Sequence, residues 1–238
     1  MRLSGDSEIQ QLISDTLAQR PYSHDQTVRD DVVAVITVES DMRFFPDTLA
    51  AVLRQSVLPS TIVIADCSGQ TLQSVQTSFK VIPTQADALH GVPQEHTVHV
   101  QVLKVAQARS FGDAVAKVLR NAQIDTAAKT LWLLHDDSRP ADPICLEQLL
   151  DTWTNTPTAA LIGCKQLDWD AVRLHDVGKY ASHHEVVSLV VDGEPDQEQY
   201  DSRSDMFAVS LAGALIPVNT WRSMHGINAW FTTYDESA

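Results

Sequence analysis

Two adjacent carboxylates follow a short apolar run in the segment TLWLLHDDSRP, which covers residues 130–140. The apolar residues predict a buried strand, and Asp136 and Asp137 stand where that strand ends. In an open α/β sheet the ligand crevice lies outside the carboxyl ends of the strands, so acids at this position meet a ligand. Two hard oxygen donors suit Mg²⁺ or Mn²⁺ carrying a substrate phosphate. The alternative is that both acids only cap a helix that begins near Pro143.

A strand–helix–strand unit earlier in the chain supplies a further acid. Residues 31–40, DVVAVITVES, form a β-branched run typical of a strand covered on both faces, and residues 61–69, TIVIADCSG, repeat the pattern. Residues 46–55 between them carry leucines and valines at helical spacing. Such a unit is parallel and right-handed. If the strand ending at Leu134 joins the same sheet in parallel, Asp66 and Asp136 lie on one edge.

The remaining predicted elements alternate between helix and strand. An apolar stripe predicts a helix over residues 6–19, which packs on its own domain or on another subunit. Residues 82–96 carry two prolines and predict a surface loop. Further strands are expected over residues 98–105, 161–163 and 186–191, and a helix over 111–119.

Composition limits the class of protein. The 238 residues, 44% of them hydrophobic, fit one large domain or two closely joined halves. With 17 basic and 31 acidic residues the net charge is -14, so nucleic acid and anionic lipid are poor partners. The three cysteines show no Cys-x-x-Cys spacing, which indicates reduced cysteines in the cytosol. No apolar run reaches the ~18 residues of a membrane span.

In order and spacing, these segments resemble the inverting family 2 glycosyltransferases of the GT-A fold. The stretch LAAVLRQSVLPSTIVIADCSG is similar to that family's first helix, Gln-x-x-x-Pro turn and second strand, and LLHDDSRP to its Asp-x-Asp segment. LAGALIPVNTWRSMHGINAWF resembles a later strand, helix and turn, and YDESA stands where the family has an acidic pair. The motifs LLHDDS and LDWD most resemble those of large actinobacterial membrane-anchored members that act on cell-envelope glycans.

The resemblance implies a nucleotide-sugar site on the strand ends. Thr37 and Glu39 occupy the position of nucleoside contacts, and Asp66 that of the acid accepting a hydrogen bond from the base. A carboxylate accepts from the imide N–H of uracil or thymine, so the expected donor is a UDP or dTDP sugar. Asp137 corresponds to the metal-binding acid, with Asp136 beside the ribose or diphosphate.

His135 replaces the first acid of the family's Asp-x-Asp segment. This change lowers the local negative charge. An imidazole can still ligate a transition metal such as Mn²⁺, or it can hold a neighbouring metal ligand in place without binding the metal itself. The expected cofactor is therefore Mn²⁺ or Mg²⁺, held by Asp137 with His135 as a candidate second ligand.

The implied reaction is direct displacement at the anomeric carbon with inversion. Asp235 and Glu236 align with the acidic pair, so one of them is the expected general base; the alternative is a solvated acidic tail. Because the family continues beyond this pair, we expect the chain to be truncated at the C-terminus, with any membrane anchor beyond Ala238. The expected location is the cytoplasm, at the inner face of the plasma membrane.

The second half is expected to bind the acceptor, a cell-envelope glycan or a lipid-linked sugar. Asp168 and Trp169 suit a sugar, because an aromatic face stacks on it and a carboxylate accepts hydrogen bonds from its hydroxyls. Trp230 is a third candidate, and either tryptophan can instead be a core aromatic.

The predicted fold class is therefore α/β of the GT-A type, with a mostly parallel central sheet flanked by helices and an acceptor-binding second half. We expect an N-terminal helical extension over residues 1–30, a nucleotide-sugar-binding half over 31–142 and a truncated acceptor-binding half over 143–238. The enzyme is expected to transfer a hexosyl or rhamnosyl group. Two alternatives are a catalytically degenerate sugar-nucleotide-binding module, suggested by His135 and Ala116, and a signalling receiver, which would be complete within ~120 residues.

Overall fold

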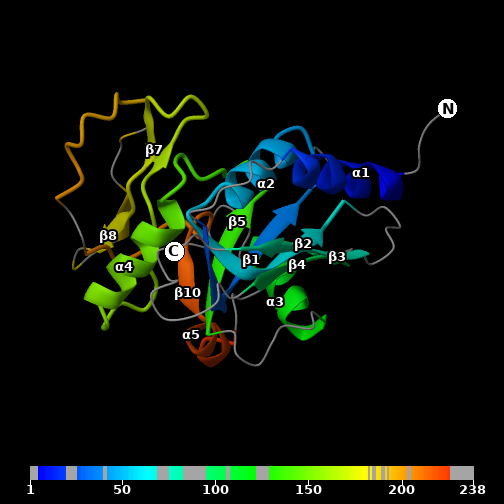
Figure 1. Cartoon of the computed structure of the whole chain (residues 1–238). Coiled ribbons are helices and arrows are strands. Elements are labelled where there is room, and N and C mark those ends of the chain that lie inside the picture. The colour runs from blue at the N-terminus through cyan, green and yellow to red at the C-terminus, as the bar shows by residue number, and fades with distance from the viewer. Residues whose placement is uncertain are drawn as a thin grey trace, which may run out of the picture.

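The computed structural model describes residues 5–19, 26–39, 42–68, 75–82, 95–105, 108–121, 129–181, 183, 186–188, 191, 193–202 and 205–225. These residues form a mixed α/β structure around one six-stranded sheet, with helices on both faces (Figure 1). The predicted fold class, α/β with a mostly parallel central sheet flanked by helices, is confirmed.

The central sheet has the strand order β10-β5-β1-β2-β4-β3. Its four inner strands run parallel to one another: β1 (Thr27–Val38), β2 (Val57–Asp66), β4 (His96–Lys104) and β5 (Thr130–His135). The edge strands β3 (Val75–Val81) and β10 (Leu215–Pro217) pair antiparallel with β4 and β5. Strands β1, β2 and β5 contain continuous apolar runs because both of their faces are buried there, whereas β4 alternates buried valines with polar residues.

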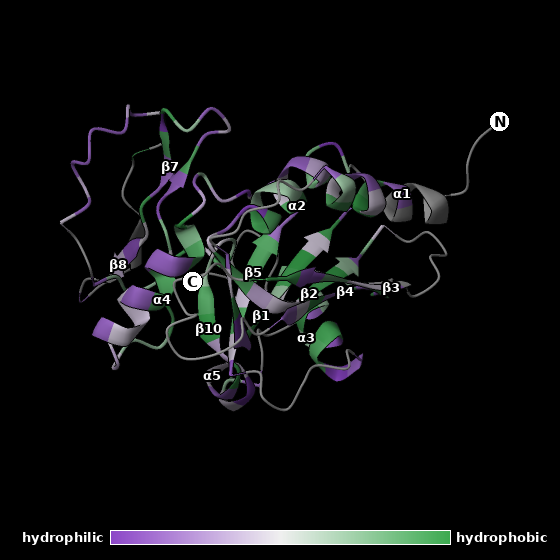
Figure 2. Cartoon of the chain, in the orientation of Figure 1, coloured by the Kyte–Doolittle hydropathy of each residue, from purple (hydrophilic) through white to green (hydrophobic). Residues whose placement is uncertain are grey.

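Five helices in the described part of the chain cover the sheet. They are α1 (Gly5–Ala18), α2 (Phe45–Leu53), α3 (Phe111–Asn121), α4 (Cys145–Asn155) and α5 (Val218–Ser223). Alternate residues of β1 separate two cores: Ala34 and Ile36 pack with α1, α2 and α4, whereas Val33 and Val35 pack with α3 and α5. Figure 2 shows the resulting apolar strands inside a more polar outer surface.

The region between α4 and β10 contains two small antiparallel pairs. One joins β6 (Gln166–Leu167) to β7 (Leu174–Asp176), and the other joins β8 (Lys179–Ala181) to β9 (Val186–Ser188). Leu174, Val177 and Val191 form a separate small cluster there. All helices of the described chain are too short or too polar to cross a bilayer.

Several predicted boundaries differ from the observed ones. The strand expected over residues 161–163 is a single bridge between Ile162 and Leu215. The edge strand β3 was not predicted, and β9 is shorter than the expected strand over 186–191. Residues 83–94 of the predicted loop lie outside the described residues, whereas β4 already begins at His96.

Candidate functional site at the carboxyl edge of the sheet

The carboxyl ends of β1, β2 and β5 lie level with one another and bring the predicted acids together. Thr37 of β1 is paired with His135 of β5 and with Ala65 of β2, and Val38 is paired with Asp66. Asp136 follows β5 directly. The expectation that Asp66 and Asp136 share one edge of the sheet is therefore confirmed.

Asp136 is buried and fixed through three of its groups. Its backbone N–H donates to the carbonyl oxygen of Thr37 at 2.9 Å, and its own carbonyl oxygen accepts from Thr48 Oγ1 of α2 at 2.7 Å. Its carboxylate Oδ2 accepts from the backbone N–H of Glu39 at 3.0 Å. Asp136 thus joins the ends of β1 and β5 to helix α2.

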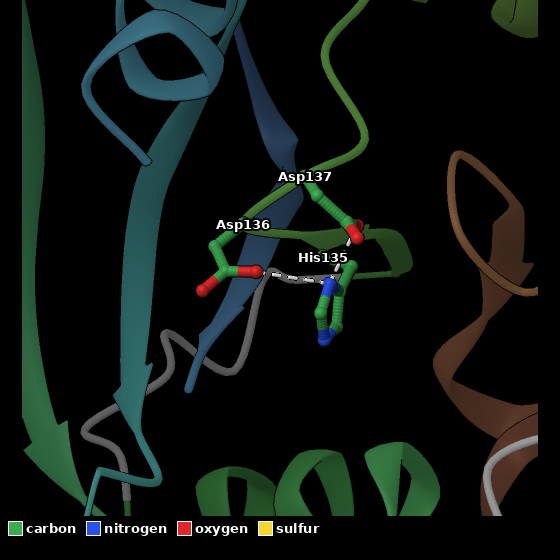
Figure 3. Close-up of side chains that lie close together, drawn as sticks. All are labelled: His135, Asp136 and Asp137. Carbon is green, nitrogen blue, oxygen red and sulfur yellow. Dashed lines mark hydrogen bonds and ion pairs between the residues drawn. The ribbon is translucent and has the colours of Figure 1, made fainter. Parts of the chain in front are cut away.

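His135 lies between the two acids (Figure 3). Its Nδ1 is 3.0 Å from Asp136 Oδ1 and 2.6 Å from Asp137 Oδ1, and its Nε2 is 3.7 Å from Glu39 Oε1. Burial of the ring favours the neutral imidazole, but hydrogen bonds to Asp136 and Asp137 and their charges outweigh burial and raise the pKa of His135 to about 10. The same hydrogen bond from His135 lowers the pKa of Asp137.

The structure does not support the capping alternative for this acidic pair. At the start of α4, the N–H of Ile144 donates to Asp142 Oδ1 at 2.9 Å, and the N–H of Leu146 donates to Gln55 Oε1 at 2.9 Å. Asp137 instead contacts His135, and its side chain is 58% exposed. Its carboxylate is open to a ligand.

Thr37 and Asp66 carry buried polar atoms without partners among the described residues. Asp66 is 1% exposed; its Oδ1 accepts from the N–H of Ser68 at 3.0 Å, but its Oδ2 has no hydrogen bond there. The hydroxyl of Thr37, which is 2% exposed, is likewise unpaired. Leaving such atoms unpaired costs free energy, so orphan polar atoms at a sheet edge point to a missing ligand.

The predicted acceptor residues Asp168 and Trp169 lie on a turn after β6. Asp168 Oδ1 accepts from the N–H groups of Val172 at 2.9 Å and Arg173 at 3.1 Å, which stabilise the turn. The Trp169 ring contacts Phe44, with 4.6 Å between the ring centroids. Trp230, Asp235 and Glu236 lie outside the described residues.

The three cysteines are unpaired in the structure. Cys67, Cys145 and Cys164 are free thiols. Cys67 follows Asp66 at the same edge, but burial, reinforced by the charge of Asp66, raises the pKa of its thiol to about 12. A protonated thiol is a poor nucleophile, so Cys67 is not a catalytic candidate.

Three residues that sequence reasoning did not single out support the site. Thr48 holds the carbonyl of Asp136, and Ser138 Oγ accepts from the N–H of His135 at 2.8 Å. Arg139 donates through Nη2 to the carbonyl oxygen of Trp169 at 2.8 Å. Ser138 could have been found from the sequence, because a serine and Pro140 follow the acids and are typical of a turn.

The donor set at this edge fits a divalent ion. One ligand atom each from His135, Asp136 and Asp137 lies within 4.8 Å of the others. Carboxylate oxygens suit Mg²⁺ or Mn²⁺, and the imidazole adds a donor that Mn²⁺ accepts. The fold and the site together define an α/β protein with an acidic ligand site at the carboxyl edge of its sheet.

Comparison with known protein families gives a match over the second half of the chain. Residues 131–238 match the family described as Glycosyl transferase family group 2. The match confirms that this chain resembles the family 2 glycosyltransferases, and it supports a general role in glycosyl transfer. It includes the acidic residues after β5 and also the terminal segment with Asp235 and Glu236.

Solved structures similar to this chain include a Staphylococcus aureus protein and a mannosyltransferase, whereas no curated protein sequence matches the chain. Staphylococcus aureus TarS 1-349 is 8% identical with a TM-score of 0.46, over 87% of this chain and 53% of that one. Mannosyltransferase PcManGT from Pyrobaculum calidifontis, in complex with GDP-Man and Mn²⁺, is 11% identical with a TM-score of 0.47, over 98% of this chain. The present chain spans 58% of that mannosyltransferase, so it corresponds to about half of either neighbour.

Proposed function

We propose that this chain contains the donor site of an inverting glycosyltransferase that uses a UDP or dTDP sugar and a divalent metal ion. The observation that carries the proposal is the buried, unpaired Asp66 Oδ2 at the edge of the sheet where Asp137 exposes its carboxylate. The Thr37 hydroxyl, at the end of the neighbouring strand β1, is also buried and unpaired among the described residues. In this proposal residues 31–142 bind the nucleotide, residues 143–238 bind the acceptor, and residues 1–30 are a helical extension.

The hydrogen bonds of Asp66 favour a uracil or thymine base. Its Oδ1 already accepts from Ser68, so only Oδ2 is free to accept from a ligand. The imide edge of uracil or thymine presents one N–H donor, whereas guanine presents an N–H and an amino group side by side, which pair best with two acceptors. Thr37 contributes a hydroxyl, and Glu39 a carboxylate that is 64% exposed, to the nucleoside.

Asp137 is the residue proposed to hold the metal ion, with His135 as the second candidate ligand and Asp136 near the ribose or diphosphate. The carboxylate of Asp136 is already occupied by Glu39 and His135, whereas that of Asp137 is half-exposed. When bound, a divalent ion supplies positive charge against the negative charge of the departing diphosphate. Mn²⁺ and Mg²⁺ both suit this donor set.

The acceptor hydroxyl is proposed to lose its proton to Glu236 or Asp235 as its oxygen forms the new bond to the anomeric carbon. The bond from that carbon to the nucleoside diphosphate breaks on the opposite face, which inverts the configuration. Asp168, Trp169 and Trp230 are the proposed acceptor contacts. The proposed acceptor is a cell-envelope glycan or lipid-linked sugar at the cytoplasmic face of the plasma membrane, and the transferred sugar is a hexosyl or rhamnosyl group.

A second candidate function is a sugar-nucleotide-binding module without turnover. It is favoured by His135, which replaces an acid of the family segment and whose Nδ1 lies within 3.0 Å of both remaining acids. A cationic imidazole at this position competes with a metal ion for the two carboxylates.

A transfer assay with the full-length protein separates the two candidates. The protein is incubated with Mn²⁺, a UDP, dTDP or GDP sugar and a membrane extract that supplies the acceptor, and the released nucleoside diphosphate and glycosylated product are measured. The transferase predicts acceptor-dependent release from a UDP or dTDP sugar. Nucleotide binding without any release, in wild type and Glu236→Gln alike, would instead establish the binding module.

A further inference from the structure

Two arginines and two aromatic rings form a stack that joins the second half of the chain to the loop carrying the acids. The guanidinium carbon of Arg139 lies 4.4 Å from the ring centroid of Trp169, and the Trp169 and Phe44 centroids are 4.6 Å apart. At the far end, Arg43 lies 4.8 Å from the Phe44 centroid. Arg139 also donates through Nη2 to the carbonyl oxygen of Trp169 at 2.8 Å.

The turn that presents Trp169 is held by its own hydrogen bonds. The N–H of Asp168 donates to the carbonyl of Arg173 at 2.8 Å, and the N–H of Ala171 donates to the carbonyl of Asp168 at 2.9 Å. Ala171 has a φ of 56°, in the left-handed region that closes such a turn. Together with the two bonds to the Asp168 carboxylate, these contacts make the turn a fixed receptor for Arg139.

We call residues 136–139 the acid loop. Upstream it is fixed by Thr37 and Thr48, which both bond to the backbone of Asp136. Ser138 closes it locally, because its N–H donates to the His135 carbonyl at 3.0 Å. The side chain of Asp137 contacts only His135 in the described hydrogen bonds and ion pairs. Besides His135, the direction of its carboxylate depends on backbone anchors on both sides, and Arg139 is the first downstream anchor. Further along, the carbonyl oxygens of Asp142 and Pro143 accept from Gln55 and Ser56.

We propose that Arg139 is a positioning residue for Asp137 and that Trp169 is its receptor. The proposal rests on the proposed function where it concerns the metal ion, and it adds a role for Trp169 as a support of the donor site. Arginine suits this task because a planar guanidinium stacks on an indole and donates to a carbonyl at once. Lysine keeps the charge but lacks the planar fork.

The test compares Arg139→Ala, Arg139→Lys, Trp169→Ala and Trp169→Phe with wild type. Arg43→Ala is the matched control, because it removes an arginine from an aromatic ring of the same group, the Phe44 ring, and leaves Arg139 and Trp169 in place. Amide hydrogen exchange of peptides covering residues 131–145 reports the acid loop, whose protected amides include those of Asp136 and Ser138. Binding of Mn²⁺ alone is measured by electron paramagnetic resonance, and thermal unfolding checks the fold.

We expect faster amide exchange in this peptide and about tenfold weaker Mn²⁺ binding in three variants: Arg139→Ala, Arg139→Lys and Trp169→Ala. Tenfold is the low end of the loss seen when a residue that supports a metal ligand is replaced. Both Trp169 variants keep the backbone carbonyl that accepts from Arg139, but only Trp169→Phe keeps an aromatic face, so it is expected to retain most of the protection. Arg43→Ala is expected to match wild type. Unchanged exchange in Arg139→Ala, or wild-type behaviour of Arg139→Lys, would overturn the positioning role. If wild type binds no Mn²⁺, the proposed metal function fails, whereas the exchange data alone still decide the positioning role.

Discussion

The backbone N–H of Glu39 donates to Asp136 Oδ2 at 3.0 Å, which joins two residues 97 positions apart in the sequence. Because Asp136 is 4% exposed and also contacts His135, its carboxylate is committed to holding two strand ends together. Asp137, one residue further, is exposed and contacts only His135 in the described hydrogen bonds and ion pairs. The two adjacent acids thus differ: Asp136 is held inside the structure, whereas the exposed carboxylate of Asp137 is the one proposed to meet a ligand.

This difference predicts that alanine substitutions of the two acids affect stability and binding differently. Asp136→Ala removes the acceptor of a buried N–H, so it should lower the free energy of unfolding by ~1 to 3 kcal/mol. Asp137→Ala removes only a partly exposed ion pair and should cost less than ~1 kcal/mol. Asp137→Ala should nevertheless abolish the metal-dependent part of nucleotide binding. Urea unfolding and calorimetry measure the two effects, and equal losses of stability would contradict the division of tasks.

Asp66→Asn tests the proposed base contact. The side-chain amide can keep the bond from Ser68, but it points an N–H₂ donor at the imide N–H of the base. We expect UDP binding to weaken by ~1 to 3 kcal/mol. Asp151→Asn, an exposed substitution on α4, serves as the control of equal charge change. A dissociation constant that stays the same in Asp66→Asn would remove Asp66 from the nucleotide site.

Glu236→Gln and Asp235→Asn test the proposed general base in the full-length protein. Loss of the base should lower the transfer rate by about 10² to 10⁴-fold, whereas the dissociation constant for the nucleotide should not change. The residue whose replacement gives the larger loss is the base. Full activity of the double variant would exclude both acids.

The start of α3 offers a test of stability against pH. Ser110 Oγ accepts from the N–H of Asp113 at 3.2 Å, and Asp113 Oδ2 lies 2.9 Å from Lys117 Nζ and accepts from the N–H of Arg109. Partial burial opposes ionisation, but the hydrogen bonds from Lys117 and Arg109 outweigh it and lower the pKa of Asp113 below 3.8. Its stabilisation is therefore complete above pH 3.8 and is lost as the pH falls through the lower native value.

Because this pair is near the surface, its loss in Asp113→Asn should cost less than ~1 kcal/mol at neutral pH. The difference from wild type should disappear in the acid range below the native pKa. Ser110→Ala should cost about 1 kcal/mol at every pH, as expected for a helix cap. An Asp113→Asn difference that persists at low pH would show that its effect does not come from the charge.

The inner strands could be predicted because a run such as VVAVIT is buried on both faces and carries its own signal. The edge strand β3, VQTSFKV, has exposed positions at Gln76, Ser78 and Lys80 and depends on pairing with β4. The three residues of β10 were expected to form a strand only through the family resemblance, and they pair with β5 and, at Leu215, with Ile162. Short edge strands are defined by their neighbours, and a local pattern does not contain them.

In the candidate site, the positions of Asp66, Asp136 and Asp137 could be predicted from the sequence, because each follows or ends a parallel strand and parallel strands end at one edge of the sheet. The bond between Glu39 and Asp136 and the stack of Arg139 on Trp169 join residues 97 and 30 positions apart. Such contacts depend on how loops meet in space. The role of Trp169 as a receptor for Arg139 therefore became visible only from the structure.

The most direct test is calorimetric titration of the protein with UDP, dTDP and GDP, each with Mn²⁺ and with EDTA. The proposed donor site predicts that UDP or dTDP binds in Mn²⁺, that GDP binds more weakly, and that EDTA or Asp137→Ala removes the metal-dependent part. Absence of binding by all three nucleotides in Mn²⁺, or equal affinity in Mn²⁺ and EDTA, would contradict the account.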